Sequence, residues 1–124
     1  MQYRIYMSMS MKKTEIWLAD LEPAKGSEIK KIRPVLIISG DISVLPIKIC
    51  VPITGWQQHF ERNFWHLKII PNIENGLQKD SALDLYQIRT LDVSRFKRKL
   101  GKIEIGFFQK IFDTMDLIFE RNNC

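Results

Sequence analysis

Arg33 is the side chain of this sequence best suited to chemistry. It stands directly before Pro34 in the segment KGSEIKKIRPVLIIS, residues 25–39, where a polar loop meets an apolar run. Proline restricts the preceding residue to extended geometry, so the pair fixes the direction in which the guanidinium leaves the strand. Five N–H donors in a rigid planar fork suit a phosphate group. The segment therefore indicates a phosphate contact at Arg33, and the competing interpretation is an ion pair with Glu28.

Groups for acid–base, thiol or metal chemistry are scarce. His59 and His66 are the only histidines, and their places in a loop and a strand do not predict a catalytic pair, so we interpret them as structural or exposed. Cys50 and Cys124 lie far apart and show no Cys-x-x-Cys spacing. We therefore expect no metal and no cofactor, and the unpaired thiols fit a reducing, cytoplasmic environment.

Aromatic side chains offer another route to nucleic acid, because bases stack on them. Trp56 and Phe60 follow Thr54 in a loop and are the better stacking candidates. Trp17 and Trp65 alternate inside expected strands, a pattern more typical of core positions. The loop after Thr54 is therefore a candidate binding surface.

The charge of the chain favours an anionic partner. Its formal net charge is +5 and its pI is about 9.3, a balance that raises association rates with polyanions. Charge alone does not distinguish RNA, DNA, a membrane surface or an acidic protein. Lys25, Lys30 and Lys31 share the loop of Arg33 and are expected to attract such a partner. The basic run RFKRK, residues 95–99, fits a solvated connection and a phosphate contact equally well.

Short strands are expected to position these residues. A chain of 124 residues can form one domain with its own core, and it is too short for two. Alternation of period two and buried apolar runs predict five strands. They are TEIWLADLE, RPVLIIS with its proline at the start, LPIKICVPIT, FWHLKII and SALDLYQIRTLD. Short strands at regular spacing are typical of a small bent barrel or sandwich.

A helix is expected at the C-terminal end, where apolar residues recur at three- and four-residue steps from about Glu104 onward. A short helical turn is also expected at DVSRF. The predicted helix carries Phe107 beside Phe108, followed by Phe112 and Phe119. This is more apolar surface than one stripe over a small barrel needs, and it favours a two-fold interface between two copies.

The first ten residues are expected to form a disordered tail, with a single domain from residue 11 to residue 124. They lack the continuous apolar core of a signal peptide, and no later apolar run approaches membrane-spanning length. Repeated methionines near the start favour Met11 as the functional first residue. We therefore expect a cytoplasmic protein with no membrane partner.

Three segments resemble successive motifs of the MazF/PemK family of toxin endoribonucleases. They are EIWLADLEPAKGSEIKKIRPVLIIS, VPIT and DSALDLYQIRTLDVSR, which run from Glu15 to about Arg95 in the family's order and at its separations. The family's plan also ends with a helix, whereas residues 1–10 have no counterpart in it. The resemblance implies a mainly β (α+β) fold, namely a small SH3-like barrel with a C-terminal helix. It also implies that the protein works as a homodimer.

The resemblance also implies an activity and its residues. It implies metal-independent, sequence-specific cleavage of single-stranded RNA by the 2′-hydroxyl, leaving a 2′,3′-cyclic phosphate and a 5′-hydroxyl, and inhibition by an acidic antitoxin. The family's catalytic arginine and threonine match Arg33 and Thr54, and Glu28 becomes either a base or a base-reading contact. With the loop residues above, the expected substrate contacts are Lys25, Gly26, Ser27, Lys30, Lys31, Trp56, Ser81 and Gln87.

One branch of the family is a poor template. In the plasmid-borne PemK/Kid proteins an arginine and an aspartate before the Q-R-T signature act as acid and base, but those positions are Asp84 and Tyr86 here. That branch's loop histidine is replaced by Ser27, and the chromosomal MazF pattern with KGSE fits better. Two other classes stay open. They are a non-catalytic SH3-like binding module and a CcdB-type gyrase poison, although this chain ends RNNC rather than Trp-Gly-Ile.

Overall fold

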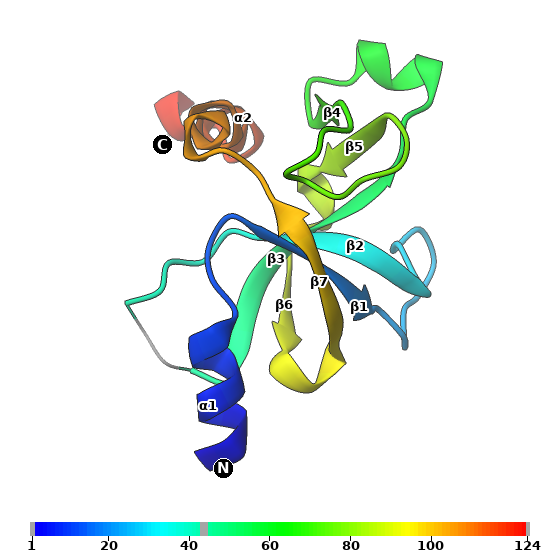
Figure 1. The fold of residues 1–124 in the computed structure, drawn as a ribbon. Helices are drawn as coiled ribbons and strands as arrows, with labels where there is room; N and C mark the ends of the chain where they lie inside the picture. Colours follow the sequence, from blue (N-terminus) through cyan, green and yellow to red (C-terminus); the bar gives the residue numbers. More distant parts are fainter. Residues whose placement is uncertain (1, 43–44, 124) are drawn as a thin grey trace.

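The computed structural model describes residues 2–42 and 45–123, so Met1 and Cys124 lie outside the described residues. Its centre is a strongly bent, seven-stranded antiparallel sheet with the strand order β4-β5-β3-β2-β1-β7, in which β6 pairs with β3 (Figure 1). The strands are β1 (Glu15–Asp20), β2 (Ile32–Ile37), β3 (Ile47–Gly55), β4 (His66–Ile69), β5 (Ser81–Asp84), β6 (Arg89–Asp92) and β7 (Phe96–Lys102). The helices are α1 (Gln2–Ser10) and α2 (Phe108–Ile118). The 3₁₀ turns are η1 (Gln58–Arg62), η2 (Leu85–Gln87), η3 (Val93–Arg95), η4 (Ile105–Phe107) and η5 (Arg121–Asn123).

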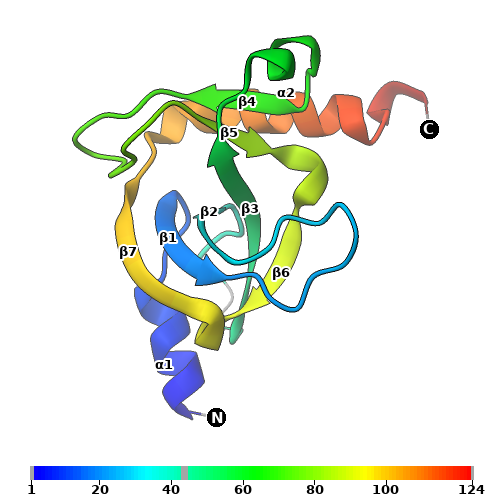
Figure 2. The same ribbon diagram turned by 90° about the vertical axis from the view of Figure 1, so that its right-hand side faces the viewer.

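Two apolar cores lie on the two faces of β2. Val35 and Ile37 point into one core and Leu36 into the other, so both faces of this strand are buried. A strand buried on both faces loses its alternation of polar and apolar residues, which accounts for the apolar run at residues 35–38. The core that holds Leu36 also contains Ile111 of α2, which lies along the β4–β5 end of the sheet (Figure 2). The prediction of a mainly β fold with a C-terminal helix is confirmed.

Two strand predictions differ from the structure. The single strand expected over residues 81–92 is divided into β5 and β6 by η2, where the Asp84 carboxylate accepts the Tyr86 N–H at 3.2 Å. The basic run at residues 95–99 is not a connection, because most of it belongs to β7, which pairs with β1, and its phosphate contact stays a prediction. Lysine and arginine are common on such edge strands, since charge discourages further pairing. The turn η3 confirms the short helix expected at DVSRF.

Residues 2–10 form α1, whereas the sequence predicted a disordered tail. Met7 packs against the core that contains Val35, and Met11 is buried there. Ser8 is also buried, and its hydroxyl donates a hydrogen bond to the Leu45 carbonyl. These contacts hold the last turn of α1 against the barrel. The sequence did not signal them because the apolar residues of α1 form no clear stripe.

The helix α2 has the amphipathic pattern that the sequence predicts. It begins at Phe108, after the turn η4, and it buries Phe108, Ile111 and Thr114 against the sheet. Within residues 2–42 and 45–123, no helix is both long enough and apolar enough to cross a membrane.

Candidate active site

Pro34 is the third residue of β2 rather than the first, and the strand pairing explains why it is tolerated there. It lies opposite Leu18 of β1. The Leu21 N–H donates to the Lys31 carbonyl at 2.9 Å, so Leu21 and Lys31 form a hydrogen-bonded pair. Every second pair along an antiparallel ladder is hydrogen-bonded, and the Pro34–Leu18 pair, three positions further along, is therefore not hydrogen-bonded. The nitrogen of Pro34 therefore faces β3, which pairs with β2 only from Val35 onward. Pro34 thus lies just past the end of the β2–β3 pairing, where a missing N–H costs least.

Arg33 and Thr54 lie on neighbouring strands, close to the point where β2 and β3 separate. The register pairs Val35 with Pro52, and Arg33 and Thr54 each lie two residues beyond this last pair, on β2 and β3 respectively. Residues two apart on a strand share a face, so both side chains project to the same side. At this point β3 leaves β2 and pairs with β5 through Thr54 and Ala82. The strand arrangement therefore places both residues on one side of the sheet near this point, and their catalytic role stays a prediction.

The guanidinium of Arg33 makes few hydrogen bonds within the described part of the protein. The side chain is half-buried, and its Nε donates a long hydrogen bond of 3.4 Å to the Lys30 carbonyl. Among the described residues, its two terminal nitrogens have no hydrogen-bond or ion-pair partner. The Thr54 hydroxyl is likewise without a protein partner in the described part of the chain. Both groups are available to an added phosphate.

The ion pair between Arg33 and Glu28 does not form among the described residues. Instead, Oε1 of Glu28 accepts the Lys25 N–H at 2.6 Å, and the Glu28 N–H donates to the Lys25 carbonyl at 3.0 Å. These two bonds close a turn over residues 25–28. Glu28 therefore does not neutralise Arg33, and the interpretation of Arg33 as one half of a structural ion pair is not supported.

Gln87 holds the loop instead of lying free for substrate. Its amide oxygen accepts the Ile29 N–H at 3.1 Å, and its amide nitrogen donates to the Ser27 carbonyl at 3.1 Å. Both hydrogen-bonding ends of the side chain are thus bound to loop backbone. Gln87, which the sequence analysis placed in direct substrate contact, positions the segment that carries Ser27 and Glu28.

Two residues of this loop adopt left-handed backbone conformations. Gly26 has φ +57°, which glycine adopts without strain. Lys31 has φ 72°, which is unusual for a side chain of its kind, and it is held there by its N–H bond to Oε1 of Glu22 at 3.2 Å. The side chains of Lys25, Lys30 and Lys31 are all exposed. The loop therefore presents positive charge on a fixed backbone.

A cavity of about 450 Å³ opens beside this loop. Residues from the loop, from η2 and from β6 line it: Ser27, Glu28, Tyr86, Gln87, Ile88, Arg89 and Thr90. Tyr86 is 58% exposed, and its ring meets Trp65 edge to face at 5.3 Å between centroids. An exposed ring beside polar loop atoms and the Arg89 cation suits an unpaired base. Sequence reasoning missed Tyr86 and Arg89 as cavity residues because only the folded chain brings them to the loop.

Trp56 and Ser81 already have partners within the protein. The ammonium group of Lys68 lies 5.0 Å from the centroid of the Trp56 ring, and Phe60 meets the same ring edge to face at 5.7 Å. Ser81 is buried, and its hydroxyl donates to the Lys79 carbonyl at 2.9 Å. Other side chains thus cover part of the Trp56 ring, and the Ser81 hydroxyl is already hydrogen-bonded within the protein.

His66 is a structural residue, in agreement with its interpretation from the sequence. Its Nε2 lies 3.4 Å from Oδ2 of Asp84, and its Nδ1 lies 3.2 Å from Nδ2 of Asn63. Phe60 stacks on the imidazole at 3.8 Å between centroids. Burial lowers the pKa of His66 below its ordinary value, and the Asp84 carboxylate opposes this shift without reversing it.

Stability is expected to fall as the pH drops below the ordinary histidine pKa of about 6.5, because the unfolded chain then binds a proton that the folded His66 resists. The contribution of His66 is fully present above that pH. Thermal unfolding between pH 8 and pH 5 measures it. The variant His66→Gln should lose part of the pH dependence, whereas the exposed His59→Gln should keep it. An unchanged slope in His66→Gln would contradict the assignment.

Metal and thiol chemistry receive no support from the described residues. Within residues 2–42 and 45–123, no group of three His, Cys, Asp or Glu side chains is placed to hold a metal ion. Cys50 is buried, and burial raises the pKa of its thiol to about 12. A thiol with that pKa stays protonated near neutral pH and is a poor nucleophile.

Comparisons with known proteins agree with the motifs. The chain matches the family described as PemK-like, MazF-like toxin of type II toxin-antitoxin system over residues 12–119. It is 36% identical over 109 residues to Endoribonuclease MazF of Staphylococcus saprophyticus, an alignment that covers 86% of this chain and 89% of that protein. It is 32% identical over 111 residues to Endoribonuclease EndoA of Bacillus subtilis, covering 88% and 94%.

Solved structures share the fold. MazF from Deinococcus radiodurans aligns with a TM-score of 0.73 at 16% identity, over 89% of this chain and 96% of that chain. An endoribonuclease in complex with its cognate antitoxin, from a mycobacterial species, aligns with a TM-score of 0.67 at 14% identity, over 89% and 95%. The family match spans most of the sequence and includes all three motifs. The chain therefore belongs to the PemK-like, MazF-like toxins of type II toxin-antitoxin systems.

Proposed function

We propose that this protein is a toxin endoribonuclease that cleaves single-stranded RNA in the cytoplasm. The observation that carries the proposal is that the side chains of Arg33 and Thr54 project to the same side of the sheet near the point where β2 and β3 separate. Both side chains have free hydrogen-bonding groups in the described structure, as a phosphate site requires. Relatives at 32% and 36% identity are named endoribonucleases, which supports the same activity here.

The proposed reaction uses a hydroxyl group of the RNA itself. The 2′-oxygen gives up its proton and forms a bond to phosphorus while the bond from phosphorus to the 5′-oxygen breaks, and the 5′-oxygen takes up a proton from water. The protein must align this attack and stabilise negative charge on the phosphoryl oxygens. The free nitrogens of Arg33 supply that stabilisation, and the Thr54 hydroxyl donates to the same phosphate.

Glu28 is the proposed acceptor of the 2′-hydroxyl proton. One of its carboxylate oxygens holds the Lys25 N–H, which leaves the other for substrate. Glu28→Gln keeps an oxygen for the turn and removes the base. A variant with unchanged kcat would show that Glu28 only shapes the loop.

Cleavage is expected to proceed without a metal ion and to leave 2′,3′-cyclic phosphate and 5′-hydroxyl ends, because the RNA provides the nucleophile. Purified protein is incubated with RNA in excess EDTA, and the product ends are identified by mass spectrometry. Added magnesium should not be required. Products with 5′-phosphate ends, or activity abolished by EDTA and restored by magnesium, would contradict this mechanism.

The loop and its cavity are the proposed place for bases next to the cleaved bond. Gly26 and Ser27 fix the loop backbone, while Lys25, Lys30 and Lys31 attract the RNA backbone. The exposed ring of Tyr86 offers a stacking surface at the mouth of the cavity. Tyr86→Ala should change the sequence preference of cleavage, and an unchanged cleavage pattern would place base recognition elsewhere.

An acidic antitoxin is the proposed inhibitor. The lysines that attract RNA present the same potential to a flexible chain rich in Asp and Glu, which can order as it binds. A structural relative is solved with its cognate antitoxin. Reversal of Lys30 and Lys31 to glutamate should weaken antitoxin and RNA together. If saturating antitoxin leaves the affinity for an uncleavable RNA unchanged, the two do not share this surface.

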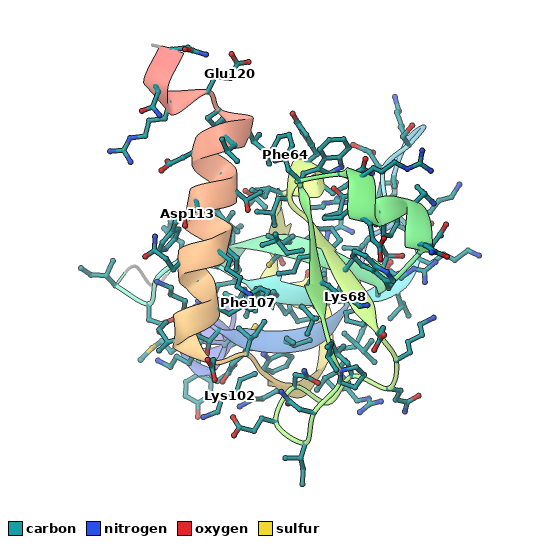
Figure 3. The ribbon with its side chains drawn as sticks, turned by 90° about the horizontal axis from the view of Figure 1, so that it is seen from above. Phe64, Lys68, Lys102, Phe107, Asp113 and Glu120 are labelled. Carbon is teal, nitrogen blue, oxygen red and sulfur yellow. The ribbon has the colours of Figure 1, made fainter. Side chains whose placement is uncertain are left out.

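A homodimer is the proposed assembly, with α2 in its interface. Phe112 and Leu117 of α2 are 47% and 62% exposed, and Phe119, which follows the helix, is 66% exposed, whereas Phe108 is buried in the protein's own core. The β4 strand lies beside α2 on the same face of the molecule (Figure 3). Burial of such side chains between two copies would stabilise the pair. Sedimentation at micromolar concentration tests this, and a monomer would contradict it.

A further inference from the structure

The strand β6 has an open edge at Thr90. In the described part of the chain β6 pairs only with β3, and Thr90 lies opposite Ile49 in that pairing. The Ile49 N–H donates to the Ser39 hydroxyl at 3.1 Å, and the Ile49 carbonyl accepts the Ile38 N–H at 3.0 Å. Both backbone groups of Ile49 thus face β2, so the N–H and the carbonyl of Thr90 point away from β3. Neither of these two groups has a partner among the described residues, and such an edge can pair with a strand of another molecule.

Two cavities meet at Thr90. The first is the cavity of about 450 Å³ described above, where the loop between β1 and β2 lies beside β6 (Figure 2). The second has a volume of about 280 Å³, and its lining includes Ser39, Ile42, Leu45, Ile47, Ile49 and Thr90. Because Thr90 belongs to both linings, a chain that pairs with β6 at this residue would pass from one cavity to the other.

The second cavity presents apolar side chains to solvent. Ile42, Leu45, Ile47 and Ile49 are all exposed, and these four residues are called the apolar patch below. Ile47 and Ile49 are two residues apart on β3 and therefore share one face of the strand. The described lining contains one cation, Lys48, which is itself buried. Such a surface suits apolar side chains of a protein better than the phosphates of RNA, which need exposed cations.

The loop beside the first cavity determines the charge of the partner. Its exposed Lys25, Lys30 and Lys31 attract acidic residues, whereas they repel a second copy of this chain, which has a net charge of +5. We propose that the acidic antitoxin binds across both cavities as an extended strand. Its backbone pairs with the open edge of β6 at Thr90, its alternate apolar side chains cover the apolar patch, and its acidic side chains face the loop. This proposal rests on the proposed function, in which such an antitoxin is the inhibitor.

Polar variants test the apolar patch, with the full-length cognate antitoxin as the probe. Ile47→Thr combined with Ile49→Thr keeps the β-branched shape that suits a strand and removes apolar surface. The double variant should bind antitoxin about tenfold or more weakly, because that surface is no longer buried in the complex. Its kcat for RNA and its affinity for an uncleavable RNA should equal those of the wild type. Ile73→Thr is the matched control, since Ile73 is exposed outside the patch, and it should change none of these values.

Two variants of Thr90 test the strand pairing. Thr90→Pro removes the outward N–H without removing a bond to β3, and it should weaken antitoxin binding about fivefold or more, the scale of one lost hydrogen bond. Thr90→Ala keeps the N–H and should bind antitoxin as the wild type does. Amide hydrogen exchange of the wild type gives a second measurement, which holds even if Thr90→Pro does not fold. Antitoxin should slow the exchange of the Thr90 N–H.

The outcomes separate this binding mode from the proposed function. Wild-type antitoxin affinity in the variant of Ile47 and Ile49, or unchanged exchange at Thr90 in the antitoxin complex, would overturn the binding mode while inhibition through the loop still stands. An equal loss of affinity for the uncleavable RNA would assign the apolar patch to RNA and would likewise overturn it. If antitoxin does not bind the wild-type protein at all, the proposed inhibition fails together with this inference.

Discussion

Arg33→Ala should lower the rate of RNA cleavage by about a hundredfold or more, the scale seen when a positioned donor to a transition state is removed. The guanidinium has terminal nitrogens without a partner among the described residues, and it lies near the point where β2 and β3 separate, so it is free to bind the phosphate. The measurement is kcat and KM with a defined RNA. Because the charge develops during the reaction, most of the loss should appear in kcat.

Conservative variants separate the role of Arg33 from a structural one. Arg33→Lys keeps the charge without the planar fork and should restore only part of the rate. Thr54→Val keeps the branched shape and removes the hydroxyl, and it should also lower kcat with little effect on folding. The exposed Arg62→Ala in η1 is the matched control for loss of one positive charge. Wild-type kcat in Arg33→Ala, or loss of the folded state in Arg33→Lys, would contradict the catalytic assignment.

Gly101→Ala should lower the free energy of unfolding by about 2 to 3 kcal/mol, in the upper range for overpacked sites. A Cβ at this position would lie 2.2 Å from the Glu74 carbonyl oxygen and 2.6 Å from the Asn75 carbonyl carbon. These are backbone atoms, so no side chain can rotate away to make room. The segment before β5 would have to leave β7, which breaks the bond from the Lys102 N–H to the Glu74 carbonyl. Denaturant unfolding measures the loss.

Gly40→Ala is the matched control, since nothing lies within 4 Å of the Cβ it would add and its backbone is not left-handed. It should change stability by less than about 0.5 kcal/mol, as surface substitutions usually do. Equal stability of the two variants would mean that the segment before β5 yields easily.

The elements with strong local signals could be predicted from the sequence. Alternation identifies β1, and the apolar run before Ile38 identifies β2, because each pattern reflects which faces are buried. The Arg33–Pro34 pair is also a local signal, since proline acts on its immediate neighbour. The resemblance then added Thr54, which neither spacing nor composition connects with Arg33.

The remaining features depend on contacts between distant parts of the chain. The strand β7 carries Lys97, Arg98 and Lys99 in succession, so it shows no alternation and is formed through its pairing with β1. The helix α1 is held by contacts of its last turn rather than by its own pattern. Gln87 was expected to touch substrate. Its two hydrogen bonds to the loop join residues that are 58 and 60 positions apart in the sequence. No local pattern reports such partners.

The pairing of β3 with two sets of strands has a consequence for the protein during its synthesis on the ribosome. The first part of β3 pairs with β2 and β6, and its last part pairs with β5, which is synthesised later. A nascent chain that ends before residue 81 has Arg33 and Thr54 but lacks the strand that holds Thr54 in place. We therefore expect the chain to gain activity only after its C-terminal third has been synthesised. Chains truncated at residue 80 should show no cleavage, and a fragment as active as the full chain would refute this timing.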